Sequence, residues 1–204
     1  YDPFCNKAEG VRHRLFKELG FKAVKFEVSN GSGLMAYHPP IDLNGEGMNG
    51  GYRHAAENGL TVVMDIGRPR NCCWQPDNLA AAIKKYPGVR FVICHLLAPQ
   101  RTDGDLLEEA LQKLALPNVW FDLASLAANQ QPEVYPYPTA VGHLKRAKRI
   151  VGAERLMFGT DMPGNLCRDS YAHLADYITL SGVFTEAELE DIFYNTALKV
   201  YFGG

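Results

Sequence analysis

The sequence predicts an α/β fold built on a parallel sheet, and two observations support this class. Short apolar runs of strand length alternate with amphipathic segments of helical length along the chain. Each connection between successive runs is also long enough to contain a helix, as parallel strand pairing requires. The chain has 204 residues, 47% hydrophobic and 22% charged, so we expect residues 1–204 to form a single domain.

The expected strands are recognised by their apolar content and by the turn residues that follow them. Residues 21–28 alternate and are rich in Val and Phe, whereas residues 60–66 are apolar almost throughout, as in a strand buried on both faces. Residues 156–158 form a short apolar run that ends at Gly159, just before Asp161. The remaining expected strands are residues 89–96 and 118–123.

Helical segments between these strands show apolar residues at three- and four-residue spacing, together with terminal signals. Gly20 ends the first helix, and Thr185 with Glu188 predicts a capping box at the start of a late one. Residues 34–51 contain so many proline and glycine residues that we expect a long loop there. The expected helices are residues 7–19, 52–57, 76–86, 105–116, 142–151, 170–180, 185–192 and 196–202.

The charge and cysteine content argue against several classes of partner. The net charge is -2, from 21 basic and 23 acidic residues mixed along the chain, so no basic surface for nucleic acid is expected. No apolar run reaches the roughly 20 residues of a membrane span, and no membrane partner is expected. The five cysteines show no CxxC spacing, which favours a reducing, cytoplasmic location. We expect a small-molecule substrate and leave homo-oligomer formation open.

Three expected strands end in a polar side chain of the kind that binds metals or transfers protons: Asp65, His95 and Asp161. Because the carboxyl ends of parallel strands meet at one edge, these side chains are expected to converge. Two carboxylates and an imidazole suit a divalent metal, or a histidine acid/base oriented by a carboxylate. The structural alternatives are a turn or N-cap aspartate at Asp161 and a hydrogen-bonded core histidine at His95. Asp65 could instead cap the following turn or pair with Arg68.

Basic side chains near these strand ends are candidates for binding a substrate. Arg68 and Arg70 follow Asp65, and each could hold a substrate carboxylate by two hydrogen bonds, although a solvated loop explains them equally well. Lys25 could face the same site, or it could pair with Glu27.

Other polar and aromatic residues receive a structural interpretation. Asp122 ends the strand after Trp120 and is a fourth candidate for the site, although a helix-capping or structural role is favoured. The aromatic-rich residues 134–138 are expected to form a loop lid. The histidines that lack ligand-type spacing, and are therefore expected on the surface, are His38, His54, His143 and His173.

Four motifs follow one another in a recognisable order. They are Lys-Lys-Tyr-Pro-Gly-Val-Arg-Phe-Val-Ile-Cys-His-Leu (84–96), Pro-Asn-Val-Trp-Phe-Asp-Leu (117–123), Gly-Ala-Glu-Arg-Leu-Met-Phe-Gly-Thr-Asp-Met-Pro (152–163) and Tyr-Asn-Thr-Ala-Leu-Lys-Val-Tyr (194–201). Together they resemble the amidohydrolase-related (amidohydrolase 2) family of metal-dependent hydrolases and decarboxylases, the group that includes aminocarboxymuconate semialdehyde decarboxylase.

The resemblance implies a TIM-type (β/α)8 barrel with a metal at the carboxyl ends of its strands. It implies that Asp161 is the metal-binding aspartate of the last strand and that His95 is the acid/base histidine of the sixth. Asp65 stands where the family usually places a metal-binding histidine. The family's His-x-His of the first strand has no counterpart here, and a barrel of this type takes about 250 residues. We therefore expect the chain to lack the N-terminal strands of an amidohydrolase-like barrel domain.

The function implied by the resemblance is that of a metal-dependent hydrolase. The expected substrate is small and carboxylated or cyclic, such as a lactone or an amide, and it is attacked by a metal-activated water. The expected cofactor is a divalent metal, with zinc preferred. The alternatives are a non-oxidative decarboxylase that uses the same site, and a non-catalytic barrel relative that has lost its metal site.

Overall fold

Five parallel strands pair in sequence order, β1-β2-β3-β4-β5, in the part of the chain that the computed structural model describes, residues 1–4, 14, 18–31, 33–38 and 40–203. The strands are β1 (Ala23–Glu27), β2 (Thr61–Asp65), β3 (Phe91–Ile93), β4 (Val119–Asp122) and β5 (Leu156–Met157). The register sets Glu27 beside Asp65 at the ends of β1 and β2. Polar residues at the strand ends are thereby gathered along one edge of the sheet.

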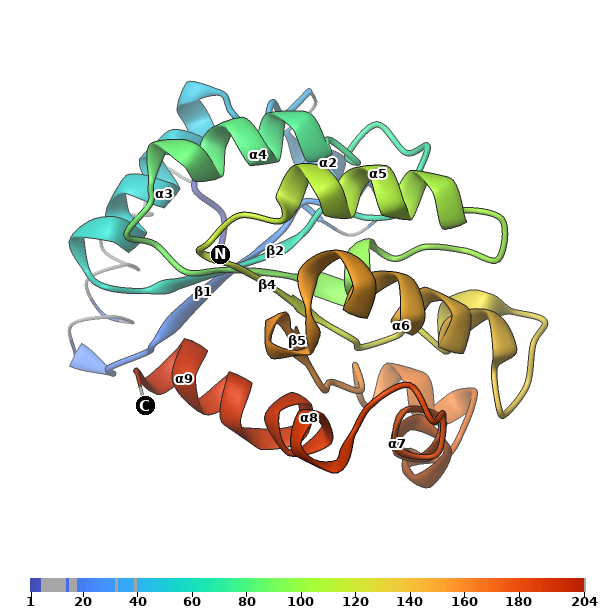
Figure 1. Cartoon of the computed structure of the whole chain (residues 1–204). Coiled ribbons are helices and arrows are strands. Elements are labelled where there is room, and N and C mark those ends of the chain that lie inside the picture. The colour runs from blue at the N-terminus through green and yellow to red at the C-terminus, as the bar shows by residue number, and fades with distance from the viewer. Residues whose placement is uncertain (5–13, 15–17, 32, 39, 204) are drawn as a thin grey trace.

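One face of the sheet is covered by a layer of helices (Figure 1). They are α3 (Glu46–Glu57), α4 (Pro76–Lys85), α5 (Gly104–Leu114) and α6 (Pro138–Val151). Their apolar stripes pack on alternate strand residues, so that Phe26, Met64 and Phe121 are fully buried in the main core. Burial of this apolar surface is the main force that holds the helices to the sheet.

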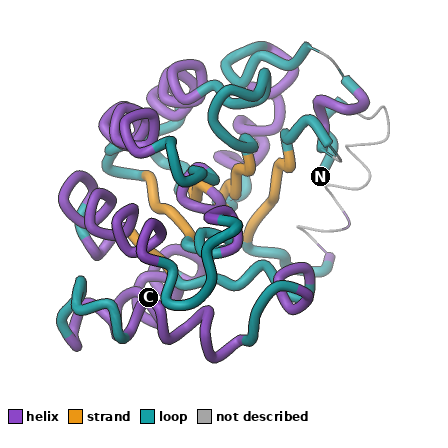
Figure 2. Tube along the Cα trace, turned by 90° about the vertical axis from the view of Figure 1, so that its right-hand side faces the viewer, coloured by secondary structure: helices purple, strands orange, loops and turns teal. Residues whose placement is uncertain are grey.

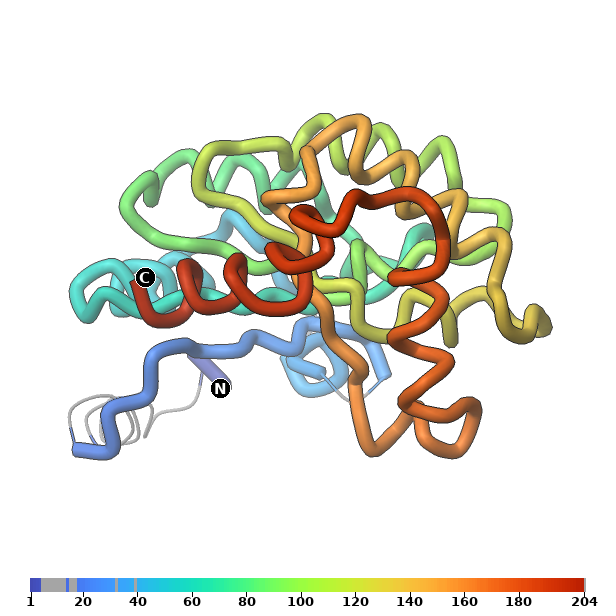
Figure 3. Tube along the Cα trace, turned by 60° about the horizontal axis from the view of Figure 1, so that its bottom comes forward, coloured from blue at the N-terminus to red at the C-terminus, as the bar shows by residue number. Residues whose placement is uncertain are grey.

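The opposite face is covered at its centre by α9 (Thr196–Phe202), which crosses in front of the strands in Figure 3. Val92, Trp120 and Met157 point to this side and form a smaller core with Val200 of the helix. Thr61 Oγ1 donates a hydrogen bond of 2.9 Å to the backbone oxygen of Val200. The sheet therefore has an apolar cluster on each face, and helices surround the strands in Figure 2.

Shorter helices complete the connections. They are α2 (Leu34–Tyr37), α7 (Tyr171–Thr179) and α8 (Glu186–Glu190). The predicted capping box is confirmed at α8, where the Thr185 side chain accepts a hydrogen bond from the Glu188 backbone and Glu188 accepts one from Thr185 N. No helix in the described ranges is long and apolar enough to cross a membrane.

All five predicted strands are confirmed, but one boundary was wrong. The predicted strand 89–96 ends at Ile93, and His95 lies in the tight turn that follows. Most of the predicted helix 7–19 lies outside the described residues.

The predicted loop 34–51 was also wrong, because α3 begins at Glu46. Met48, Tyr52 and Ala55 of α3 are fully buried, and this apolar stripe outweighs the low helix propensity of its glycines. Gly51 in particular is required by packing. A Cβ atom there would lie 2.8 Å from Cζ of Phe26.

His143 was predicted to lie on the surface, and this was wrong. It is one of the buried residues of α6 and is 1% exposed. Nε2 of the ring lies 3.2 Å from the backbone oxygen of Gln100 and donates to it. Burial lowers the pKa of His143 below its ordinary value.

Candidate active site

A cavity of about 400 Å³ opens at the carboxyl ends of the strands, and we call it the strand-end cavity. Asp65, His95 and Asp161 all line it, so the predicted convergence of these side chains agrees with the geometry. Arg68 lines it as well. The other residues that line it are Glu27, Ser29, Asn30, Gly31, Gly67, Asn71, Ala98, Ser125, Asn129, Gly164, Asn165 and Arg168.

Asp65 is fixed by the turn that follows β2. Its Oδ1 accepts a hydrogen bond of 2.9 Å from the backbone nitrogen of Gly67. Gly67 has φ +71, a region that suits glycine, and a Cβ atom there would lie 2.6 Å from Sγ of Cys73. With Oδ1 held in this way, Oδ2 is directed at His95, whose Nε2 lies 3.0 Å away.

His95 is presented by a turn with an unusual backbone. His95, Leu96, Leu97 and Ala98 all have positive φ, between 48 and 67. Such φ values cost non-glycine residues roughly 1 kcal/mol or more each, and they persist only where surrounding contacts enforce them. One such contact is the 2.8 Å hydrogen bond from His95 N to Asp122 Oδ1.

Both ring nitrogens of His95 face acceptors. Nδ1 donates to the backbone oxygen of Ala124 at 3.0 Å, and Nε2 donates to Asp65. Burial alone would lower the pKa of His95, but the hydrogen bond to Asp65 and the negative charges of Asp122, Asp65 and Asp161 outweigh it and raise the pKa to about 9. The ring is therefore an imidazolium at neutral pH.

The pKa of Asp65 changes in the opposite direction. Burial would raise it, but the hydrogen bond and positive charge of His95, together with the backbone donor of Gly67, lower it to about 2. Asp65 and His95 thus form a charged, hydrogen-bonded pair whose side chains are only 11% and 13% exposed.

Asp161 lies in the loop after β5 and is exposed to the cavity, with φ 57. Its Oδ2 accepts a hydrogen bond of 2.6 Å from Ser125 Oγ. Asn165 Nδ2 in turn donates to Ser125 Oγ at 2.9 Å and to Thr160 O at 2.7 Å. The loops after β4 and β5 are joined by this chain of bonds, which sets the position of the carboxylate.

Ser125, Asn165 and Arg168 were missed in the sequence. They lie in loops without periodicity or a metal-ligand spacing, so no local pattern separates them from ordinary turn residues. Asp122 does have the predicted structural role, since its Oδ1 accepts hydrogen bonds from the backbone nitrogens of His95 and Ala124.

The three predicted substrate-binding residues are placed differently from one another. Arg68 lines the strand-end cavity and has no hydrogen bond or ion pair from its side chain to any described residue. Lys25 Nζ lies 3.3 Å from Glu27 and 4.0 Å from Asp65, at the edge of the site. Arg70 does not line the cavity, because its guanidinium pairs with the carboxylate of Asp103, a residue that is 1% exposed.

A metal ion fits the donor atoms around Asp65. Asp65, Cys94 and His95 offer a carboxylate oxygen, a sulfur and an imidazole nitrogen that all lie within 4.8 Å of one another. Such a mixed donor set suits a borderline ion such as zinc. An ion bound to Nε2 would replace the proton that His95 shares with Asp65. His95 therefore cannot be a ligand and a proton donor at the same time.

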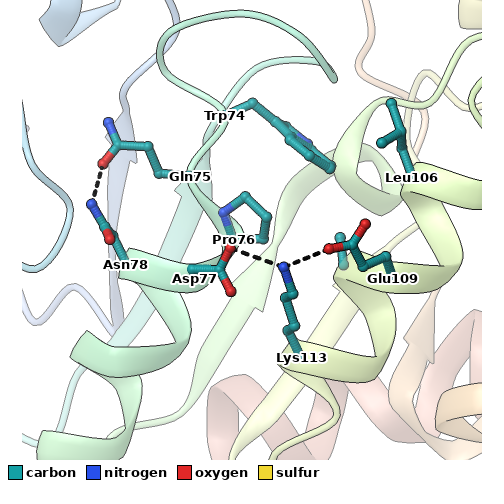
Figure 4. A pocket seen from close by; sticks show the side chains of 9 residues that line it. Trp74, Gln75, Pro76, Asp77, Asn78, Leu106, Glu109 and Lys113 are labelled. Atoms are coloured by element: carbon teal, nitrogen blue, oxygen red, sulfur yellow. Dashed lines mark hydrogen bonds and ion pairs between the residues drawn. The ribbon is translucent and has the colours of Figure 1, made fainter.

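Another cavity, of about 430 Å³, lies between α4 and α5 in the outer helix layer (Figure 4). Its charged groups already satisfy one another, because Lys113 Nζ lies 2.9 Å from Asp77 and 2.7 Å from Glu109. The lining residues include no histidine or cysteine. The strand-end cavity is therefore the better candidate for chemistry.

Comparison with known proteins identifies the family of the chain. The sequence matches the family model for amidohydrolases over residues 11–203, and the chain belongs to that family. The family fold is a TIM-type barrel, which confirms the predicted fold class and the resemblance. Among curated proteins, none matches the sequence significantly.

Solved structures of similar fold include hydrolases and decarboxylases. An amidohydrolase from Burkholderia multivorans has a TM-score of 0.80 at 19% identity, covering 98% of this chain and 71% of that one. A putative 2-pyrone-4,6-dicarboxylic acid hydrolase from Pseudomonas putida has a TM-score of 0.71 at 20% identity, with 98% and 69% covered. A 2,6-dihydroxybenzoate decarboxylase from Rhizobium has a TM-score of 0.64 at 15% identity, with 98% and 68% covered.

Metals occur in some of these structures. One structure of the Burkholderia amidohydrolase contains zinc, and a dihydroxybenzoic acid decarboxylase from Polaromonas contains manganese.

Proposed function

We propose that this protein is a metal-dependent hydrolase that acts on a small carboxylated or cyclic substrate, such as a lactone or an amide. The observation that supports this most is the meeting of Asp65, His95 and Asp161 in one cavity at the strand ends. Family membership supports the reaction class, and the hydrolases among proteins of similar fold support it further.

His95 is the proton donor in this proposal. Nδ1 donates to the backbone oxygen of Ala124 and Nε2 to the side chain of Asp65, so we assign proton transfer to Nε2, which exchanges its bond to Asp65 for one to the substrate. Asp65 orients the ring and stabilises its positive charge. As the scissile bond breaks, the imidazolium gives its proton to the leaving oxygen or nitrogen, which would otherwise depart as an unstable anion.

Asp161 accepts the proton of the attacking water. Its Oδ2 is held by Ser125, while Oδ1 has no hydrogen-bond donor among the described residues and is exposed to the cavity. Asp65 and Asp161 would also hold a divalent ion, with zinc preferred, whose chemistry is to lower the pKa of a bound water. Arg68 binds a substrate carboxylate through its unpaired guanidinium.

The experiment compares variants of the purified full chain on a panel of small lactones and amides. We expect Asp161→Asn and His95→Gln each to lower kcat/KM by at least about 100-fold, since each removes one proton-transfer group. Asp105→Asn, an exposed aspartate on α5, is the matched control and should keep full activity. Absence of bound metal together with full activity of Asp161→Asn would overturn the proposal.

Metal analysis of the same variants separates the two roles open to His95. If His95 transfers protons, His95→Gln loses activity but retains the metal, whereas Asp65→Asn loses the metal. Loss of metal from His95→Gln would identify His95 as a ligand, together with Asp65 and Cys94.

A decarboxylase is the second candidate, and the charged state of His95 favours it. Loss of carbon dioxide leaves a carbanion that must be protonated, and a donor with a pKa of about 9 holds its proton at neutral pH. Release of carbon dioxide from an aromatic acid, without hydrolysis of any lactone or amide, would favour this reaction.

A further inference from the structure

A cavity of about 380 Å³ lies between the segment 127–137 and the start of α7, next to the strand-end cavity. We call it the aromatic cavity, because Tyr135, Tyr137 and His173 supply its ring surfaces. The segment that precedes α6 and the helix α7 lie at the same end of the molecule in Figure 1. The residues that line it are Ala127, Ala128, Gln131, Glu133, Val134, Tyr135, Tyr137, Arg168, Asp169 and His173.

The rings of this cavity are ordered against one another. Tyr135 and His173 stack with centroids 4.3 Å apart and planes at 18°, and Tyr137 stands edge-on to Tyr135 at 6.4 Å and 88°. The residues predicted to form a lid therefore pack against α7 through aromatic contacts. They form a wall with a flat face of the kind on which planar groups stack.

Asp169 holds two of these side chains in place. Its Oδ1 lies 2.6 Å from His173 Nδ1, and its Oδ2 accepts a hydrogen bond from the hydroxyl of Tyr137. The backbone nitrogen of Ser170 also donates to Oδ1, at 2.7 Å. The charge of Asp169 is thereby satisfied within the protein, and the wall is preorganised before a ligand arrives.

Arg168 connects this cavity with the candidate active site, because it lines both. Its guanidinium has no hydrogen bond or ion pair to any of the described residues. Glu133, the other acidic residue of the aromatic cavity, accepts hydrogen bonds from the backbone nitrogen and the hydroxyl of Thr139. Its Oε1 also lies 3.7 Å from Nε of Arg101. Arg168 is therefore the charged group of the aromatic cavity that is left to bind an anion.

We propose that the aromatic cavity is an anchoring site for a planar carboxylate, with Arg168 pairing with the carboxylate and Tyr135 stacking on the planar group. The inference rests on the proposed function in one respect, since it assigns this ligand to the non-reacting part of the substrate. The reacting bond would then lie in the strand-end cavity, on the other side of Arg168.

Two physical features select a planar acid over other ligands. A guanidinium is planar and offers parallel N–H donors that match a carboxylate. The face of a tyrosine ring stacks on a flat conjugated group but makes less even contact with a puckered ring of the same size. A planar carboxylate satisfies both groups at once.

Binding of two matched probes tests the inference without any turnover. Benzoate and cyclohexanecarboxylate have the same charge and nearly the same size, and they differ in planarity. We expect benzoate to bind the full chain about fivefold more tightly by calorimetric titration, as one ring stack contributes. It should also shift the ring resonances of His173 in NMR spectra, because His173 stacks on Tyr135.

Variants assign the two contacts separately. Arg168→Gln should weaken binding of both probes about tenfold, whereas Tyr135→Leu should remove only the preference for benzoate. Arg53→Gln, an exposed arginine on α3 that pairs with Glu46, is the control and should change neither affinity. Equal affinities for the two probes, or a preference that survives Tyr135→Leu, would overturn the inference.

The same data keep this inference separate from the proposed function. If no lactone, amide or acid is turned over but the probes behave as expected, the anchoring site stands and the proposed reaction fails. If hydrolysis is found while benzoate shows no preference and no shift at His173, the reaction stands and the anchoring site fails.

Discussion

At the scale of single residues, the chemistry of the site depends on the contact between His95 and Asp65. A buried imidazole would ordinarily be neutral at pH 7, and it is the carboxylate 3.0 Å from Nε2 that keeps this ring charged. In the metal-free protein, Asp65→Asn should therefore lower the pKa of His95 from about 9, because it removes the hydrogen bond and the charge of Asp65 while burial still opposes the charged ring. An NMR titration of the His95 ring measures this change directly.

Asp161→Asn is the matched control for that titration. The charge of Asp161 is the last of the causes that raise the pKa of His95, so this substitution should lower the pKa less than Asp65→Asn does. If the two variants had equal effects, the hydrogen bond between Asp65 and His95 would not be the dominant contact.

Single residues also mark where prediction from sequence succeeded and where it ended. The convergence of Asp65, His95 and Asp161 was predictable because each follows an apolar strand, and parallel strands bring their ends together whatever the loops do. The position of Arg70, in contrast, was not predictable from the sequence. It is two residues from Arg68 in sequence, yet it pairs with Asp103 from a different connection, and only the tertiary fold decides that.

At the scale of secondary structure, the strands and the second half of α3, residues 52–57, were predictable, and the first half of α3 was not. The β strands consist mainly of apolar residues, which is a strong signal, whereas Gly47, Gly50 and Gly51 make the first half of α3 look like a loop. Its stability comes from packing on the sheet and not from its own helix propensity. The left-handed turn that presents His95 was missed for a similar reason, because contacts from neighbouring loops enforce it.

Two adjacent glycines of α3 provide a test of this packing. Gly50→Ala should raise the free energy of unfolding by about 1 kcal/mol, since no atom lies within 4 Å of the added Cβ and alanine favours the helix. Gly51→Ala should instead lower it by about 1 to 3 kcal/mol, because the new Cβ would lie 2.8 Å from the buried ring of Phe26. Urea unfolding of both variants measures whether each substitution raises or lowers the free energy of unfolding. Stabilisation by both would show that α3 does not pack closely on β1.

At the scale of the whole molecule, the sheet explains why the candidate site lies at one end. The faces of the sheet are covered by apolar layers, and at the strand ends the cavity opens where charged groups are gathered. Burial opposes the charged forms of Asp65 and His95, but their hydrogen bond and the neighbouring charges outweigh it, lowering the pKa of Asp65 and raising that of His95. The stability of the fold and the charge state of the site are therefore linked through pH.

That link predicts how the stability of the metal-free protein varies with pH. The pKa of His95 is raised from 6.5 to about 9 by folding, so its contribution is fully present below pH 6.5 and is lost as the pH rises toward 9. Between pH 6.5 and 8.5 the free energy of unfolding should fall by roughly 2 kcal/mol, at most about 1.4 kcal/mol for each pH unit. The pKa of Asp65 is lowered, so its contribution is lost only in acid, as the pH falls from 3.8 toward 2.

Urea unfolding at pH 6.5, 7.5 and 8.5 measures the expected fall in the free energy of unfolding as the pH rises. The Asp65→Asn variant is measured in the same way for comparison. This variant should start less stable at pH 6.5 and then lose less stability than the wild type up to pH 8.5, because the pKa of its His95 differs less between the folded and unfolded states. The upper limit of pH 8.5 keeps Cys94 out of the measurement, since burial raises the pKa of its thiol and destabilises the fold only above about pH 9. A wild-type stability that does not change over this range would mean that His95 is neutral in the folded protein, and the proton donor assigned to it would then be absent.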